Sequence, residues 1–140
     1  METTLAILKP DTVAAGHAGK VLAHLEGEGF SIRGTKVLHL TRSQAEEFYA
    51  VHRERPFYGS LVAFMTEGPV MPVALERADA VAHLRRVMGA TDVANAEPGT
   101  IRSLHGTSIE RNAIHGSDSL DNASRELAFF FSTAELIAAR

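Results

Sequence analysis

The arrangement of apolar residues limits the fold of this chain more than any other feature. Some segments have the short apolar runs of strands, and others have apolar residues at the spacing of amphipathic helices. A short apolar run favours a buried strand, whereas apolar residues three or four positions apart favour an amphipathic helix. Strands are predicted at residues 5–8, 32–40, 70–75 and 127–131. Helices are predicted around residues 18–25, 45–52, 61–65, 80–88 and 120–126. The order does not alternate strictly, which favours an α+β sandwich with helices on one face of a mostly antiparallel sheet.

Turn and capping residues define some of these boundaries. Gly27 and Gly29 are expected to end the first helix, and Thr41 and Gln44 have the spacing of a capping box. Pro72 lies inside a predicted strand, although proline suits a strand start, an edge or a bulge. Residues 89–112 are rich in turn-forming residues and predict a long loop, and loops of this length are usually either functional or disordered.

Length and charge narrow the classes of function. The 140 residues suit one domain spanning positions 1–140. A net charge of -3 gives no electrostatic reason to bind nucleic acid or an anionic membrane. The chain has no cysteine, which excludes disulfides and thiolate chemistry. The N-terminal METTLAILKPD lacks signal-peptide features, and no stretch approaches the roughly 20 apolar residues of a membrane span, so a cytoplasmic location is expected.

The stretch RNAIHGSDS, residues 111–119, places a histidine among small and polar residues. Neutral imidazole is a good nucleophile when one ring nitrogen is free and a carboxylate or carbonyl holds the other. Beside His115, Gly116 would provide space and, if needed, an unusual backbone angle. Glu126 and Ser117 are the candidates for holding the ring. This residue set predicts a nucleophilic histidine.

If the group that His115 attacks is a phosphoryl group, positive side chains must also face the site. Arg102 and Arg111 flank this loop, whereas Lys9 and Arg85 end earlier elements. Arginine suits phosphate because its planar fork binds two oxygens.

Other interpretations of these motifs are weaker. A structural role for His115 stays open on chemistry alone, and the other six histidines are expected to be surface or hydrogen-bonded residues. No two histidines have HExxH spacing, so a zinc site is not expected. The segment GHAGK at 16–20 has two residues between its glycines instead of the four of a P-loop, and Val21 replaces the magnesium-binding hydroxyl residue.

Five segments, in order along the chain, resemble nucleoside diphosphate kinases. They are LAILKPD at 5–11, FYAVHRERPFYGSLVAFMTEGPV at 48–70, RRVMGAT at 85–91, PGTIR at 98–102 and NAIHGSDS at 112–119. The resemblance covers nearly the whole chain. It implies a ferredoxin-like βαββαβ core with a four-stranded antiparallel sheet. It also implies a ping-pong reaction, in which a histidine carries the γ-phosphoryl group from a nucleoside triphosphate to a nucleoside diphosphate.

The resemblance further implies roles for individual residues. His115 matches the phosphorylated residue, with Nδ1 as the expected atom, and Ser117 and Glu126 match the pair that orients its ring. The other matches are Lys9 and Asn112 for sugar hydroxyls and phosphates, Arg85, Thr91 and Arg102 for the phosphate clamp, Phe57 and Ile109 for stacking on the base, and Tyr49 near the histidine.

Cofactor, substrates and assembly follow from the same resemblance. Mg²⁺ is expected, held mainly by nucleotide phosphates and not by a protein metal site. The expected partners are ATP and other nucleoside tri- and diphosphates, with broad base and sugar specificity because stacking uses the π-face that every base has. A homo-oligomer is expected, either a tetramer or a hexamer built from a common dimer. Pro72, Arg77 and His105 depart from the family pattern. These three residues are expected to affect local packing or subunit contacts and not the chemistry of the site.

Two other functions are compatible with a reactive histidine. A phosphohistidine carrier or signalling protein would accept a phosphoryl group and pass it to another protein. It would have no use for a base-stacking residue and a sugar clamp, so the predicted pocket argues against it. A non-catalytic nucleotide-binding or assembly protein is disfavoured by the intact His115, Ser117 and Glu126.

Overall fold

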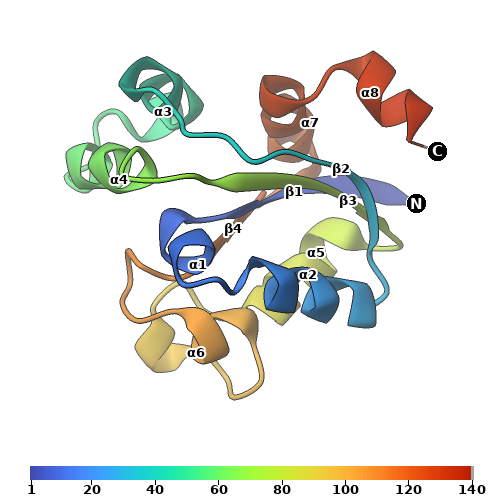
Figure 1. Ribbon diagram of the computed structural model, residues 1–140, viewed down its shortest axis with the longest axis horizontal. Helices are drawn as coiled ribbons and strands as arrows, with labels where there is room; N and C mark the ends of the chain where they lie inside the picture. Colours follow the sequence, from blue (N-terminus) through green and yellow to red (C-terminus); the bar gives the residue numbers. More distant parts are fainter. Residues whose placement is uncertain (140) are drawn as a thin grey trace.

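The computed structural model describes residues 1–139, which build a four-stranded antiparallel sheet with helices packed on it (Figure 1). The strands lie in the order β2-β3-β1-β4. They span β1 Glu2–Leu8, β2 Ser31–Thr35, β3 Met71–Arg77 and β4 Ile114–Gly116. The α-helices are α1 Pro10–Ala14, α2 Ala18–Gly27, α3 Arg42–Phe48, α4 Tyr58–Met65, α5 Ala80–Met88, α6 Ile101–His105, α7 Leu120–Phe130 and α8 Thr133–Ala138. This architecture confirms the predicted α+β, ferredoxin-like class.

Helices cover both faces of the sheet, so the prediction of one covered face was wrong. Side chains alternate between the faces along a strand. Leu5 and Ile7 of β1 belong to one core, with residues of α3, α4 and α7, whereas Ala6 and Leu8 belong to a second core, with residues of α2 and α5. Figure 1 shows α3, α4, α7 and α8 on one side and α1, α2, α5 and α6 on the other. The physical reason is that β1 is apolar at four successive positions, and such a run needs cover on both sides.

The fourth strand was predicted in the wrong place. Residues 127–130, expected as strand, belong to α7, where Ala123, Leu127 and Phe130 are buried at helical spacing. A short apolar run does not by itself distinguish a strand from a buried helix segment, which explains the error. The strand that completes the sheet is β4, which pairs with β1 and carries His115.

The predicted strand 32–40 is interrupted, and its surroundings are partly exposed. The pairing of β2 with β3 shifts register between Ile32 and Gly34, and Leu38 forms only an isolated bridge beyond the strand. A bulge of this kind bends and twists an edge strand.

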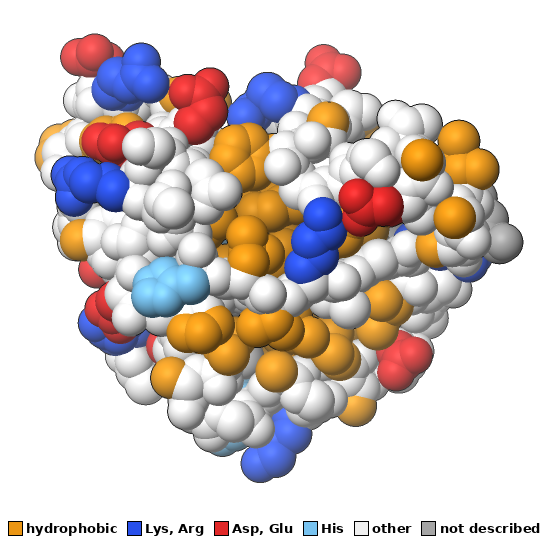
Figure 2. Space-filling model, turned by 45° about the horizontal axis from the view of Figure 1, so that its top comes forward, with side chains coloured by type: hydrophobic (Ala, Val, Ile, Leu, Met, Phe, Trp, Pro, Cys, Tyr) orange, Lys and Arg blue, Asp and Glu red, His pale blue; other side chains and the backbone are white. Residues whose placement is uncertain are grey.

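Figure 2 shows hydrophobic side chains across the face that carries α3, α7 and α8. Val37 is 62% exposed, so the end of this segment is not fully packed.

Pro72 is accommodated inside β3, an interior strand. Its carbonyl accepts hydrogen bonds from the Lys36 backbone N–H at 3.3 Å and from Thr35 Oγ1 at 3.1 Å. The N–H and C=O groups of one strand residue point to the same side. The edge of β3 on which Pro72 lacks an N–H donor therefore faces the end of β2. For this reason the pairing of β3 with β1 loses no hydrogen bond.

Some helix boundaries were predicted and three short helices were not. The end of α2 at Gly27 and the capping box of Thr41 and Gln44 are confirmed. The long loop contains α6 and a 3-10 turn, Val93–Asn95, while α1 starts with Pro10 at a first-turn position that tolerates proline. The last unpredicted helix is α8. Within residues 1–139, no helix is long and apolar enough to cross a membrane.

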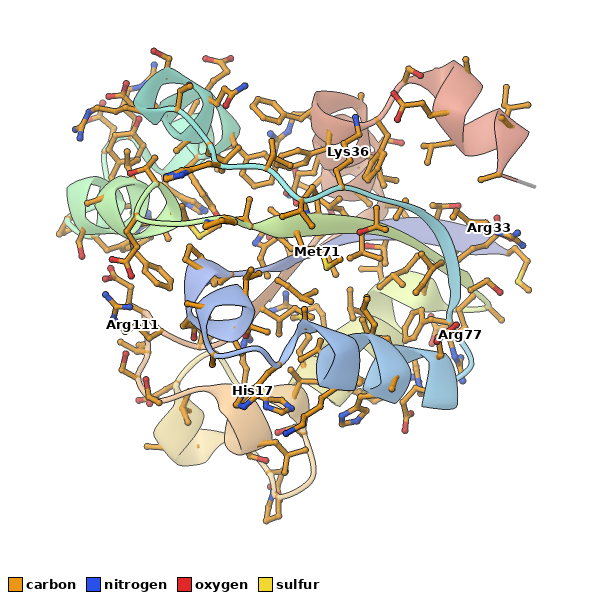
Figure 3. All side chains as sticks on the ribbon, viewed as in Figure 1. His17, Arg33, Lys36, Met71, Arg77 and Arg111 are labelled. Atoms are coloured by element: carbon orange, nitrogen blue, oxygen red, sulfur yellow. The ribbon has the colours of Figure 1, made fainter. Side chains whose placement is uncertain are left out.

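Arg77 and His105 make local packing contacts. Arg77 Nε donates to the Glu28 carbonyl at 2.7 Å, and its guanidinium lies 5.8 Å from the centre of the Phe30 ring. The His105 ring lies 5.0 Å from that of His17. Arg77 and His17 lie on the side of the sheet that carries α2 (Figure 3).

Candidate active site

A pocket of about 490 Å³ lies where the end of β1, strand β4 and helices α3 to α7 converge. Except for Ser117, the predicted site residues all line it: Lys9, Tyr49, Phe57, Arg85, Thr91, Arg102, Ile109, Asn112, His115 and Glu126. Ser117 is fully buried and contacts Glu126. Arg77 does not line the pocket, nor does His105. The fold thus brings together side chains from positions 9 to 126 of the sequence.

His115 presents one side of its ring to the pocket. Its position in β4, opposite Ile7 of β1, turns the side chain toward α3 and α7. Nε2 lies 2.6 Å from Glu126 Oε1, and because an ionised carboxylate only accepts hydrogen bonds, Nε2 carries the proton and donates. Within residues 1–139, Nδ1 has no hydrogen-bond partner, and the side chain is 22% exposed. The lone pair of Nδ1 is therefore available to an incoming group.

Glu126 is itself held in place. It lies on α7 with its side chain 8% exposed, and Ser117 Oγ donates to the same oxygen that faces the imidazole, at 3.0 Å. The backbone N–H of Ser117 donates to the Leu5 carbonyl at 3.0 Å, which ties the end of β4 to β1. The carboxylate, the hydroxyl and the ring form one hydrogen-bonded unit that fixes the orientation of His115.

Aromatic rings enclose the other side of the imidazole. The Phe48 and Tyr49 rings lie 5.6 Å and 6.3 Å from that of His115, both in edge-on arrangements. Burial, and then the charge of Glu126, raise the pKa of the Tyr49 hydroxyl far above its ordinary value, so the phenol stays neutral. Within residues 1–139 this hydroxyl has no hydrogen-bond partner. Tyr49 combines ring packing with a hydroxyl that has no hydrogen-bond partner among the described residues, beside His115.

The unusual backbone angle lies at Ala113 and not at Gly116. Ala113 has φ of 74°, in the left-handed region, while Gly116 has no positive φ. Three hydrogen bonds hold Ala113: its carbonyl accepts from the Lys9 N–H and from Thr12 Oγ1, both at 2.9 Å, and its N–H donates to Asp11 Oδ2 at 3.0 Å. Backbone strain of this kind persists only where several contacts impose it.

Gly116 is required for close packing. A Cβ atom at this position would lie 2.8 Å from Met88 Sδ and 3.0 Å from a methyl group of Leu84. Glycine lets β4 approach α5 closely. Gly116 was expected to leave space beside His115. The space left by its missing side chain lies on the opposite face of β4 and is filled by Met88 and Leu84 of α5.

Lys9 and Asn112 form a buried polar pair at the end of β1. Lys9 Nζ donates to Asn112 Oδ1 at 2.8 Å, and Asn112 Nδ2 donates to the Thr91 carbonyl at 3.0 Å. Burial, and then the positive charge of Arg102, lower the pKa of Lys9 from its ordinary 10.5 to about 8. An anion in the pocket would favour the charged form of this lysine.

Arg102 connects α6 to the C-cap of α5 and to strand β4. It is 6% exposed, and its two terminal nitrogens donate to the carbonyls of Gly89 at 3.0 Å and Ile114 at 2.8 Å. Burial and then the charge of Arg85 lower its pKa from 12.5 to about 10. Within the described part of the chain its Nε has no partner. Arg85, which is exposed on α5, adds a second guanidinium.

The mouth of the pocket is apolar and open. Phe57, at the N-cap of α4, is 48% exposed, and Ile109 is 62% exposed. The His52 ring lies 5.5 Å from that of Phe57. Large apolar side chains that are not buried at a pocket mouth provide a surface for a flat ligand.

Several pocket residues were not predicted as site residues. They are Phe48, Val51, His52, Leu61, Glu110, Gly116, Asp118, Asn122 and Arg125. The side-chain amide of Asn122 donates to Asp118 at 2.5 Å and lowers the pKa of that carboxyl. Asp118 lies within the histidine motif, just before the N-cap of α7, so its place beside His115 in the sequence was a usable signal.

The pocket wall carries a carboxylate that fits a Mg²⁺ ion bound to a phosphate ligand. Within residues 1–139, no group of three or more His, Cys, Asp or Glu is placed to hold a metal ion. Asp118 is a carboxylate on the pocket wall, and Mg²⁺ usually binds one or two carboxylates together with phosphate oxygens and water. Asp118 is the residue that would contact such an ion.

Comparisons with known proteins agree over nearly the full length. The family model described as "Nucleoside diphosphate kinase" matches residues 2–136. A nucleoside diphosphate kinase from Chlorobium chlorochromatii is 55% identical over 137 residues, covering 98% of both chains. One from Geobacter sp. (strain M21) is 54% identical, covering 98% of this chain and all of the relative.

Solved structures give the same result. The Aquifex aeolicus nucleoside diphosphate kinase superposes with a TM-score of 0.93 and 44% identity, covering 96% of this chain and 97% of the other. A Halobacterium salinarum nucleoside diphosphate kinase in complex with CDP superposes with a TM-score of 0.91 and 42% identity, covering 96% and 90%. With the matched fold and sequence, these similarities show that the chain is an enzyme of the nucleoside diphosphate kinase family, a family of phosphotransferases.

Proposed function

We propose that the enzyme transfers a phosphoryl group between nucleotides through phosphohistidine at His115. Nδ1 forms a bond to the γ-phosphorus of a nucleoside triphosphate, while the bond from that phosphorus to the β–γ bridging oxygen breaks. The nucleoside diphosphate leaves with that oxygen. A second diphosphate then attacks the phosphohistidine through its terminal oxygen and restores the free ring. This ping-pong scheme needs one nucleotide pocket only.

The Glu126 contact carries this proposal. When neutral imidazole, protonated at Nε2, forms a bond through Nδ1, the ring becomes positively charged. The carboxylate 2.6 Å from Nε2 offsets that charge and lowers the energy of the intermediate. Ser117 Oγ donates to the same carboxylate oxygen and helps to hold it in place. A histidine with only a structural role would not need Nδ1 to be free.

We assign phosphate binding to the cations of the pocket. Phosphoryl transfer depends mainly on positioning and charge neutralisation. Lys9, Arg85 and Arg102 surround the floor, and the buried Nε of Arg102 is a donor for a phosphate oxygen. A Mg²⁺ ion carried on the nucleotide phosphates would supply further charge neutralisation, and Asp118 is a carboxylate that could contact it. Tyr49 Oη is a further donor beside His115.

Broad nucleotide specificity is part of the proposal. Phe57 and Ile109 would stack on the base, which uses no base edge and so favours purines and pyrimidines alike. Lys9 and Asn112 would bind the sugar hydroxyl that ribose and deoxyribose share. The Halobacterium salinarum relative was solved in complex with CDP, which supports nucleotide binding by this chain.

Assembly and location complete the proposal. We propose one domain spanning residues 1–140, in a cytoplasmic homo-oligomer, a tetramer or a hexamer built from dimers. β2 lies at the end of the sheet order, and hydrophobic side chains lie exposed on the face shown in Figure 2, which supports self-association.

A two-stage labelling experiment tests the reaction. The protein is mixed with γ-labelled ATP and Mg²⁺, freed of nucleotide, and then given GDP or dTDP. Label that enters the protein and then moves to either diphosphate supports the kinase. Label that leaves only when a protein acceptor is added would identify a phosphohistidine carrier, and a protein that takes up no label would be a non-catalytic binder.

A further inference from the structure

The pocket wall that carries Ile109 is a small closed turn. The backbone N–H groups of Thr107 and Ser108 donate to the Arg111 carbonyl at 2.8 Å and 3.3 Å. The Arg111 N–H donates back to Ser108 Oγ at 3.0 Å. Because these bonds close the turn on Arg111, the position of Arg111 determines where Ile109 lies.

The side chain of Arg111 is attached to α4. Its two terminal nitrogens donate to Glu67 Oε1 at 2.7 Å and Oε2 at 3.1 Å, and its guanidinium lies 4.8 Å from the centre of the Phe64 ring. Figure 3 shows Arg111 at the side of the molecule where α4 lies. A two-point ion pair combined with ring stacking fixes both the distance and the orientation of a guanidinium.

The same helix carries the opposite wall of the pocket mouth. Phe57 is the N-cap of α4, Phe64 lies in its last turn, and Glu67 follows its C-terminus. A second contact ties the two walls near their middle, where Ser60 Oγ of α4 donates to Glu110 Oε2 at 2.5 Å. The turn that carries Ile109 and the helix that carries Phe57 are therefore joined at two places.

We propose that Arg111 and Glu67 form a clamp that sets the spacing between Phe57 and Ile109, which makes Arg111 a positioning residue for the nucleotide base. This inference rests on the proposed function, in which those two side chains stack on the base. Arg111 does not itself line the pocket, so its effect on nucleotide binding passes through Ile109.

The clamp has little to do with stability. The Arg111 and Glu67 side chains are 46% and 43% exposed, and ion pairs of this kind contribute little to the free energy of unfolding. Stacking on a base depends more strongly on this ion pair, because the base loses contact with one of the two side chains when Phe57 and Ile109 lie too far apart. Loss of the clamp is therefore expected to weaken nucleotide binding without unfolding the protein.

The test compares a ligand that has a base with one that has none. Arg111→Gln and Glu67→Gln are each expected to weaken ADP binding and raise the nucleotide KM about threefold to tenfold, with kcat almost unchanged. Calorimetry with inorganic pyrophosphate should show unchanged affinity in both variants. The exchanged pair Arg111→Glu with Glu67→Arg should recover most of the ADP affinity. Arg42→Gln, which breaks the exposed pair of Arg42 and Glu46, is the matched control and should change neither ligand.

Two results would overturn the clamp. One is unchanged ADP affinity in both single variants. The other is an equal loss of pyrophosphate and ADP affinity in Arg111→Gln, which would make Arg111 a direct phosphate contact. Failure of the proposed function looks different: the wild-type protein would transfer no phosphoryl group, while any dependence of ADP affinity on Arg111 would still be measurable.

Discussion

The floor and the mouth of the pocket are built in contrasting ways. At the floor, Lys9, Arg102 and Glu126 are nearly buried, and each is held by hydrogen bonds to other parts of the fold. At the mouth, Phe57 and Ile109 are about half exposed or more and depend on a surface ion pair for their spacing. Under the proposed function this difference is expected, because the floor must fix the reacting atoms, whereas the mouth has only to hold the flat ring of a base.

Removing the nucleophile should have the largest effect at the floor. His115→Ala is expected to abolish labelling of the protein by γ-labelled ATP and to abolish transfer, because no other group replaces Nδ1. Binding of ADP and thermal unfolding should stay close to wild type, since the side chain is partly exposed. Residual transfer that proceeds through a labelled protein would place the nucleophile elsewhere.

Neutralising the supporting carboxylate should have the next largest effect. Glu126→Gln keeps a hydrogen-bond acceptor for Nε2 but cannot offset the positive charge of the phosphorylated ring. Transfer is expected to fall about 10² to 10³-fold, with ADP affinity little changed. Single-turnover kinetics measures this directly, and Glu26→Gln on the exposed side of α2 is the control. An unchanged rate would mean that Glu126 only packs against the ring.

Lys9 links the floor to stability through pH. Its pKa falls from 10.5 to about 8 on folding, so the unfolded chain binds the proton more tightly. The cost to the folded state is full below about pH 8 and disappears above about pH 10.5. It amounts to about 3 kcal/mol. The free energy of unfolding of the wild type should therefore rise by that amount relative to Lys9→Met as pH rises through this window.

Denaturant unfolding at several pH values checks this prediction. Lys9→Met also leaves Asn112 Oδ1 without its donor, which costs about 1–3 kcal/mol at every pH and so does not alter the slope. A difference between the two proteins that stays constant with pH would show that Lys9 titrates normally in the folded protein.

The mouth should respond most weakly. Phe57→Ala removes one face of the base stack, so nucleotide affinity is expected to fall about tenfold. The free energy of unfolding should change little, because the side chain is about half exposed. The loss should be similar for ADP, GDP and dTDP, measured as binding constants. A loss confined to one base would contradict recognition by stacking.

Sequence reasoning predicted the residues of the pocket better than the elements that carry them. Lys9, Phe57, Arg102 and His115 lie together as expected, because a motif specifies chemistry and order along the chain. The strand that carries His115 was missed, since three residues are too few to show an alternating pattern. Their catalytic roles stay predictions.

Tertiary contacts account for the remaining errors. The left-handed angle at Ala113 depends on Asp11 and Thr12, about a hundred positions earlier in the chain, and no local pattern reports it. Residues 127–130 are helical because they continue α7, whose N-terminus is capped by Ser119. The apolar side of this helix, including Leu127 and Phe130, is buried against the sheet. The backbone angle at Ala113 and the helical state of residues 127–130 both depend on contacts with distant parts of the chain. The neighbouring residues in the sequence do not reveal these contacts.

The identity of the phosphorylated atom tests the account most directly. The protein is labelled with ¹⁵N-histidine, phosphorylated with ATP and Mg²⁺, and examined by ³¹P and ¹⁵N NMR under alkaline conditions that preserve phosphohistidine. We expect a single phosphohistidine at His115 with phosphorus bonded to Nδ1 and a proton on Nε2. Phosphorus on Nε2, or on any residue other than His115, would contradict the role given to Glu126 and with it the proposed mechanism.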